Sequence, residues 1–234
     1  MKVHLLQQGI RHFIESQLQS DRVDWYFPHS LVHRFNTEWQ KLPERGLRET
    51  YDQGLRSEIS QRWWKRDKVD AKEIMLQLID ADPELAAIAW KDLAQPQASL
   101  DGRLSRFNYY CEQLLEIHRD KQIKSLENYH QQDAKLMSLY LAGIFPGSNA
   151  LYPGLESFQT FCKTIGSPDI PKVDDLVRYM KVSAIIFNFL QKEEQYQLFL
   201  ESRLPPKHSI HCIPFQVTYE VVTHVALNTQ TLSS

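Results

Sequence analysis

The chain has 234 residues, of which 42% are hydrophobic and 24% are charged, and its formal net charge at pH 7 is −2. This length is sufficient to bury a substantial core, and the composition is ordinary for a globular protein. The near-neutral charge excludes a basic field over the whole molecule, so any nucleic-acid binding would require a local basic patch.

Cysteine usage and hydropathy indicate a reducing, aqueous environment. Cys111, Cys162 and Cys212 lie far apart and form no C-x-x-C pair, which argues against a disulfide framework or a zinc knuckle. The N-terminal stretch is too polar for a secretory signal peptide, and no run approaches the roughly 20 apolar residues that span a bilayer. We therefore expect a soluble, cytoplasmic protein without a membrane partner.

Helical periodicity dominates the first part of the chain. Apolar residues recur at spacings of three and four in five segments, which are residues 3–19, 30–41, 45–59, 69–78 and 83–93. Asp82 and Pro83 are typical of a helix start, since a short carboxylate caps and proline fits the first helical position. We expect a loop at residues 95–102, which is also a candidate sub-boundary.

A second series of helices is predicted beyond this loop, at residues 104–124, 133–145, 155–165, 173–191 and 195–204. The clearest is 133–145, where Asp133 is a candidate N-cap and Pro146–Gly147 should end the helix near Phe145. Gly166 is a natural terminator of the following helix. These patterns indicate buried helices and do not by themselves indicate a catalytic or binding site.

The last thirty residues are the exception. Residues 210–227 are rich in Val, Thr, Tyr, Phe and Ile, which favours a strand. Phe215, Tyr219, Val222 and Ala226 nevertheless recur at helical spacing, so both conformations stay open. We predict an all-α fold, with a single compact multi-helix domain over residues 1–204 and an extension of undetermined conformation over 205–234.

The run QRWWKRDK at residues 61–68 has the most unusual composition in the chain. Its candidate nucleic-acid-binding residues are Arg62, Trp63, Trp64, Lys65, Arg66 and Lys68. Aromatic rings can stack on bases while cations hold phosphates. The alternative is that one tryptophan packs into the core and the basic residues are solvated. Adjacent helical residues point about 100° apart, so the two rings are not expected to share one surface.

Catalytic motifs are missing from the sequence. It contains no G-x-x-x-x-G-K-[ST], no G-x-S-x-G, no H-E-x-x-H and no spaced Cys/His quartet. His208 and His211 have metal-like spacing but lack a second ligand pair. We therefore expect no metal, no cofactor and no enzymatic activity.

The tightest polar pair is His130 with Asp133, at i,i+3 spacing. A carboxylate there could orient the imidazole for proton transfer or metal ligation. One histidine and one aspartate make an incomplete site, so the simpler interpretation is that Asp133 caps a helix and His130 hydrogen-bonds a loop. A small hydrolase or nuclease using His130 and Asp133 is the alternative function.

A succession of helix-packing residues extends over roughly residues 60–204, most clearly over 102–194. Its members are Arg106–Phe107, Tyr110–Cys111, Leu114–Leu115, His130, Asp133, Ser138–Leu141, Phe145–Pro146, Leu151–Tyr152, Arg178–Tyr179 and Lys181–Val182. This pattern resembles the region ahead of the motor in McrB-type AAA+ ATPases, which are restriction-associated proteins of bacteria. The resemblance lies in packing positions and includes no catalytic signature.

The resemblance implies a helical module that recognises modified or foreign nucleic acid or a partner protein. In that family a downstream motor hydrolyses nucleotide and an associated nuclease cuts DNA. This chain has no Walker motif, so the resemblance implies neither nucleotide hydrolysis nor DNA cleavage by this chain. No active-site residue of the family can be placed in it. We expect the chain to be either a fragment or a free-standing relative of the module.

We therefore expect a non-catalytic recognition or adaptor module of a bacterial anti-phage restriction system. Its candidate partners are DNA and an AAA+ motor or nuclease subunit. A protein-interaction scaffold, with residues 210–227 docking on a partner, is a further alternative.

Overall fold

The computed structural model describes residues 1–19, 26–56, 61, 63–66, 69–121, 133–203 and 213–229. Nearly all regular structure in this part of the chain is helical, which confirms the all-α class. The residues form two compact units, one of residues 1–33 with 145–234 and one of residues 34–144. The division coincides with neither the candidate sub-boundary at 95–102 nor the boundary placed at residue 205.

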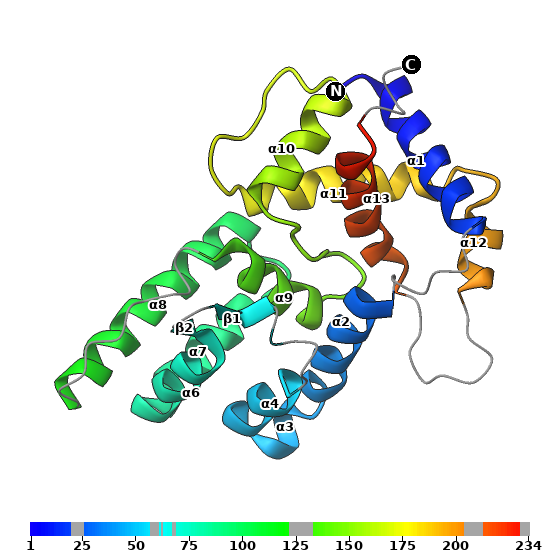
Figure 1. The fold of residues 1–234 in the computed structure, drawn as a ribbon. Coiled ribbons are helices and arrows are strands. Elements are labelled where there is room, and N and C mark those ends of the chain that lie inside the picture. The colour runs from blue at the N-terminus through cyan, green and yellow to red at the C-terminus, as the bar shows by residue number, and fades with distance from the viewer. Residues whose placement is uncertain are drawn as a thin grey trace. The chain divides into compact units, whose positions relative to one another are not determined.

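The first unit is built from helices at both ends of the chain. They are α1 (Val3–Leu18), the first part of α2 (Tyr26–Trp39), α10 (Leu155–Thr164), α11 (Leu176–Leu190), α12 (Tyr196–Ser202), the 3-10 helix η2 (Pro214–Gln216) and α13 (Val217–Leu227). Helix α13 contacts α1, α10 and α11, and lies among them in Figure 1.

Helix α13 resolves the ambiguity of residues 210–227 in favour of a helix for its described part. Val217, Val221, Val222 and Val225 are fully buried, and their spacing puts them on one helical face. The valine content that favours a strand is therefore outweighed by burial of this face against three other helices.

The hydrogen bonds of this unit confirm one predicted helix end and correct one predicted helix start. After α10, Gly166 adopts φ +62°, and the Ser167 N–H donates to the Cys162 carbonyl at 2.8 Å. Helix α11 begins later than expected, because Asp175 is its N-cap and accepts the Arg178 N–H at 2.9 Å.

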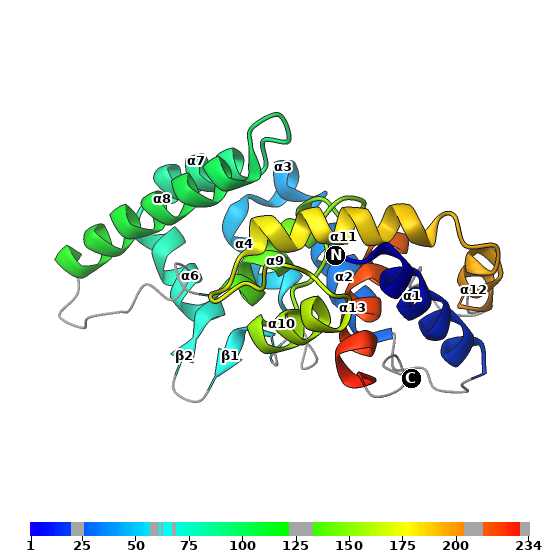
Figure 2. The same ribbon diagram turned by 90° about the horizontal axis from the view of Figure 1, so that it is seen from above.

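The second unit contains the rest of α2 and a series of helices interrupted by a short antiparallel ribbon. Its other elements are α3 (Leu42–Arg45), α4 (Leu47–Gly54), β1 (Lys65–Arg66), β2 (Val69–Asp70), α6 (Ala71–Ala81), α7 (Pro83–Leu93), α8 (Leu100–Lys121) and α9 (Ala134–Ile144). Helix α8 packs along α7 and contacts α6 (Figures 1 and 2).

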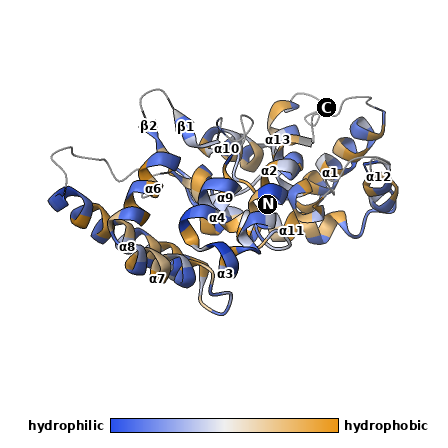
Figure 3. Ribbon diagram, turned by 90° about the horizontal axis from the view of Figure 1, so that it is seen from below, coloured by the Kyte–Doolittle hydropathy of each residue, from blue (hydrophilic) through white to orange (hydrophobic). Residues whose placement is uncertain are grey.

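Local capping explains where these helices begin. Asp82 accepts the Leu85 N–H at 2.9 Å and Pro83 follows it, as the sequence predicts. The loop expected at 95–102 is shorter, since α8 already begins at Leu100 and the Ser99 hydroxyl accepts the Gly102 N–H at 3.3 Å. Hydrophobic and hydrophilic residues alternate along α1 and α8, as expected of helices with one buried face (Figure 3).

An aromatic cluster forms the core of the second unit. It comprises Phe35, Tyr51, Trp90, Phe107 and Tyr140, whose contacting ring centroids are between 4.8 and 6.5 Å apart. The hydroxyls of Tyr51 and Tyr140 share a buried hydrogen bond of 2.7 Å, which satisfies two polar groups inside the cluster.

Candidate functional site

The basic run at residues 61–68 leads into the ribbon of the second unit. Residues 63 and 64 are helical and β1 follows directly, with Lys65 paired to Asp70 and Arg66 paired to Val69. Arg62 and Lys68 lie outside the described residues, and Arg66 is described only through its backbone pairing.

Both tryptophan rings of the run are buried, Trp63 at 7% and Trp64 at 6% exposure. Trp63 Nε1 donates to the Lys135 carbonyl at 2.8 Å, and the Lys72 ammonium lies 5.9 Å from the centre of a Trp64 ring. The core interpretation therefore applies to both rings. Their burial removes stacking on bases from the possible roles of this run.

Lys65 is the one cation of the run whose side chain is described, and it is exposed. Its cross-strand neighbour Asp70 caps α6 by accepting the Glu73 N–H at 3.0 Å. Lys65 has no ion-pair partner among the described residues. In the same unit, by contrast, Arg48 pairs with Asp80 at 2.7 Å. The ribbon thus presents a cation that is free to contact a phosphate.

Asp133 is the N-cap of α9, as predicted. Its side chain is buried, and Oδ1 accepts the N–H groups of Lys135 at 2.9 Å and of Leu136 at 3.2 Å. These bonds satisfy donors that a helix start leaves unpaired. His130 lies outside the described residues, so its pairing with Asp133 stays a prediction.

Two further chemical roles find no support in the described part of the chain. No three of its His, Cys, Asp and Glu side chains are grouped to hold a metal ion, and His208 and His211 fall outside it. Burial raises the pKa of the Cys111 thiol to about 12 and also raises the pKa of Cys162, so neither thiol is poised as a nucleophile.

The structure reveals a buried ionic network in the first unit. Glu220 of α13 accepts two hydrogen bonds from Arg203 Nη1, at 2.8 and 2.7 Å, and its Oε1 lies 2.8 Å from His29 Nε2. Arg203 Nη2 also donates to Gln17 Oε1 at 2.7 Å. His29 is 0%, Arg203 5% and Glu220 8% exposed. The network links α1, α2, α12 and α13 around one carboxylate.

A second histidine contact lies beside this network. His12 Nδ1 of α1 and His224 Nε2 of α13 are 2.9 Å apart, and the edge of Phe13 packs against the His224 ring. A pocket of about 280 Å³ adjoins both features and is lined by residues of α1, α2 and α13, including Gln17, Glu220 and His224.

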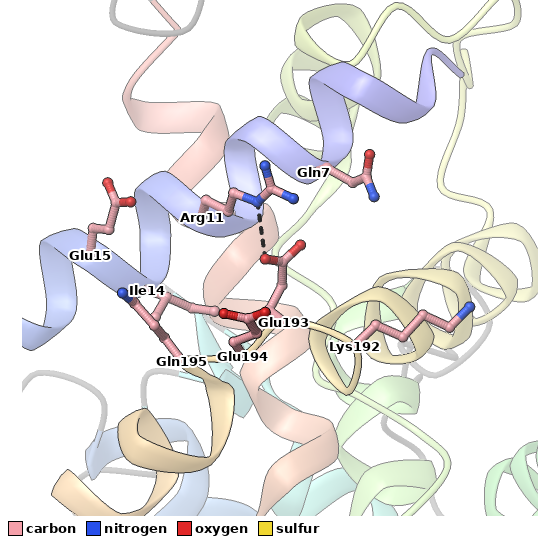
Figure 4. A pocket seen from close by; sticks show the side chains of 8 residues that line it. All are labelled: Gln7, Arg11, Ile14, Glu15, Lys192, Glu193, Glu194 and Gln195. Atoms are coloured by element: carbon pink, nitrogen blue, oxygen red, sulfur yellow. Dashed lines mark hydrogen bonds and ion pairs between the residues drawn. The ribbon is translucent and has the colours of Figure 1, made fainter.

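A larger pocket of about 390 Å³ lies between α1 and the turn that follows α11. Figure 4 shows Arg11 of α1 directed at Glu193 of that turn, with Nε and Oε2 3.0 Å apart. The other lining residues are Gln7, Ile14, Glu15, Lys192, Glu194 and Gln195. Charges of both signs line this surface groove, and the lining contains no cysteine, serine or histidine.

The buried network has only a faint signal in the sequence. Glu220 and His224 are one helical turn apart in an otherwise apolar stretch, which is unusual for a buried helix. Their partners His29 and His12 lie 191 and 212 residues away in the chain, so spacing could not pair them.

Comparison of this chain with known protein families, with curated proteins and with solved structures finds no match. Among the described residues, no helix is both long and apolar enough to cross a membrane.

Proposed function

We propose that this chain is a non-catalytic recognition module that binds nucleic acid through the ribbon of residues 65–70 and the basic residues beside it. The supporting observation is that Trp63 and Trp64 are buried while Lys65 is exposed and has no ion-pair partner among the described residues. The two buried tryptophans attach the ribbon to the core, and the exposed Lys65 is available to contact a ligand.

This arrangement favours contacts to phosphates over contacts to bases. A lysine ammonium is a compact point charge with three donors, which suits a phosphate oxygen. Phosphate contacts position a protein on nucleic acid and carry no sequence information. The module should therefore bind with little sequence preference and with strong salt dependence, because each contact releases counterions.

The proposed cellular setting follows from the resemblance to the region ahead of the motor in McrB-type AAA+ proteins. In that setting the module belongs to a bacterial restriction system, and the chemistry is carried out by an AAA+ motor or nuclease subunit that it recruits. An adaptor role toward such a subunit is the second part of this proposal.

The test is a fluorescence-anisotropy titration of the full chain against single- and double-stranded DNA at about 50 and 200 mM salt. We expect affinity to fall steeply with salt. Lys65→Glu should weaken binding, and the double variant Arg62→Glu, Lys65→Glu should weaken it further and reduce the salt slope by about one for each lost phosphate contact.

The matched control is Lys91→Glu, which reverses an exposed lysine on α7 of the same unit. Its affinity should stay close to that of the unchanged chain. Equal weakening by Lys65→Glu and Lys91→Glu would indicate a general charge effect and would refute the ribbon as the binding surface. No binding at low salt would refute nucleic-acid recognition and leave the adaptor role, tested by co-purification with the motor or nuclease subunit.

The alternative function, a small hydrolase or nuclease, has a separate test. His130→Ala should abolish any hydrolytic activity of the purified chain if His130 is its base. Asp133→Ser, which keeps a capping oxygen, should abolish activity only if the carboxylate takes part in the chemistry.

A further inference from the structure

The C-terminal segment of the described chain is attached to the first unit through two histidine contacts. His224 of α13 meets His12 of α1 at 2.9 Å. His29 of α2 accepts the Ile213 N–H on Nδ1 at 2.8 Å and lies 2.8 Å from Glu220 through Nε2. Residues 213–227 are thus joined to α1 and α2 by imidazole nitrogens.

The hydrogen-bond geometry requires unprotonated nitrogens in both contacts. Two ring nitrogens at 2.9 Å can share one proton, because a second proton would set N–H against N–H. His29 Nδ1 likewise accepts a backbone N–H, so its ring proton is on Nε2 and faces Glu220. The His12–His224 pair keeps its hydrogen bond when one ring takes up a proton on its outer nitrogen, and loses it when both rings are protonated, whereas the released rings can take up both protons.

The surroundings of His224 oppose its charged form. Burial, and the proximity of His12, lower the pKa of His224 from 6.5 to about 4. Glu220 stands one turn before His224, and Arg203 makes two hydrogen bonds to that carboxylate. The carboxylate of Glu220 is therefore already paired with Arg203.

Charged groups on the remaining helices do not offset this effect. Helices α10 and α11 also contact α13. Their charged side chains are Glu156, Lys163, Arg178 and Lys181. None of these groups contributes to the lowered pKa of His224, which is caused by burial and by the proximity of His12. On α1, Arg11 is engaged with Glu193 in an ion pair.

We propose that His12 and His224 form an acid-sensitive latch, which holds α13 on the first unit near neutral pH and releases it as the pH falls. Release would expose the buried valine face of α13 and the surfaces of α1, α10 and α11 that it covers. The device would make an apolar surface available only in acid.

The direction follows from proton linkage. The folded-state pKa of His224 lies below the ordinary value of 6.5, so the released form binds protons more readily. Stability from the latch is fully present above about pH 6.5 and is lost as the pH falls toward about 4. If the whole lowering of the His224 pKa contributes, the released fraction increases about twentyfold when the pH falls from about 7 to 5. Because His224 is partly exposed, we expect a smaller increase of about tenfold.

Hydrogen exchange of the full chain, followed by mass spectrometry of the α13 peptide, measures this equilibrium. After correction for the intrinsic pH dependence of exchange, protection of α13 should fall about tenfold from about pH 7 to 5. In His224→Gln the fall should be largely absent, because an amide does not titrate, and in His12→Gln it should be reduced, because burial still lowers the pKa of His224. His4→Gln, which replaces an exposed histidine on α1, should keep it.

A pH dependence of α13 protection that survives undiminished in His224→Gln would overturn the latch. Should the glutamine variants fold poorly, an NMR titration of the His224 ring in the unchanged chain decides the matter. A measured pKa below about 5 supports the proposal, and one at the ordinary histidine value refutes it.

Discussion

The close approach of α2 and α9 in the second unit makes Gly143 the position most sensitive to a single added methyl group. A Cβ atom at residue 143 would lie 2.2 Å from Phe35 Cδ1, 2.7 Å from its Cγ and 2.9 Å from its Cβ. The Asn36 amide also donates to the Gly143 carbonyl at 2.8 Å, which holds the two helices together at this point. We predict that Gly143→Ala destabilises the unit.

The magnitude depends on whether Phe35 can move. Its ring contacts Trp39, Trp90 and Tyr140, with centroids 6.2, 6.5 and 6.0 Å away, so a displacement of the ring would disturb these contacts. Overpacking of a filled core costs about 1–3 kcal/mol, and alanine returns up to about 1 kcal/mol of helix propensity. Because the contact at 2.2 Å is severe, we expect a net loss of about 2 kcal/mol.

Denaturant unfolding monitored by tryptophan fluorescence measures this loss, since Trp39 and Trp90 lie beside Phe35. Gly147→Ala is the matched control, because a Cβ there meets no atom within 4 Å. In the double variant Phe35→Leu, Gly143→Ala, the smaller side chain at residue 35 should relieve the clash. The double variant should therefore lose less free energy of unfolding than the sum of the losses in the two single variants. A Gly143→Ala protein as stable as the unchanged chain would refute the packing described for α2 and α9.

Two other substitutions test the polar interactions. Glu220→Ala leaves the buried Arg203 without its carboxylate and should lower the free energy of unfolding by about 3–5 kcal/mol, measured by thermal or denaturant unfolding. The double variant Arg203→Met, Glu220→Leu should recover most of that loss. An equal loss in the single and double variants would contradict the ion pair. Asp133→Ala removes the N-cap of α9 and should cost about 1 kcal/mol, while Asp133→Ser should cost only a few tenths; a large loss in both would show that the carboxylate has a role besides capping.

Helix positions were predictable from sequence because most helices carry local signals at their ends. Asp82 with Pro83, Asp133 and Gly166 act through hydrogen bonds or backbone angles within a few residues of themselves. The pairing of helices was not predictable in the same way. The first unit combines residues 1–33 with 145–234, and no local pattern indicates that α1 and α13 pack together.

The conformation of α13 shows where local propensity is insufficient. Its valines favour a strand when taken one by one, and the helix forms because their spacing lets all of them be buried on one face. Whether such a face exists depends on α1, α10 and α11, which are remote in sequence. The same remoteness concealed the His29–Glu220–Arg203 network and the His12–His224 pair.

Burial of Trp63 and Trp64 also limits what the basic ribbon can recognise. Stacking of bases on aromatic rings contributes about 1–3 kcal/mol per base in single-strand binding, and neither ring is exposed to provide it. Phosphate contacts alone do not distinguish a modified base from an unmodified one. We therefore expect the ribbon to bind modified and unmodified duplexes equally. A clear preference for modified DNA would mean that the base is read by residues outside 61–70, and the charge-reversal variants at Arg62 and Lys65 would then lower affinity without changing that preference.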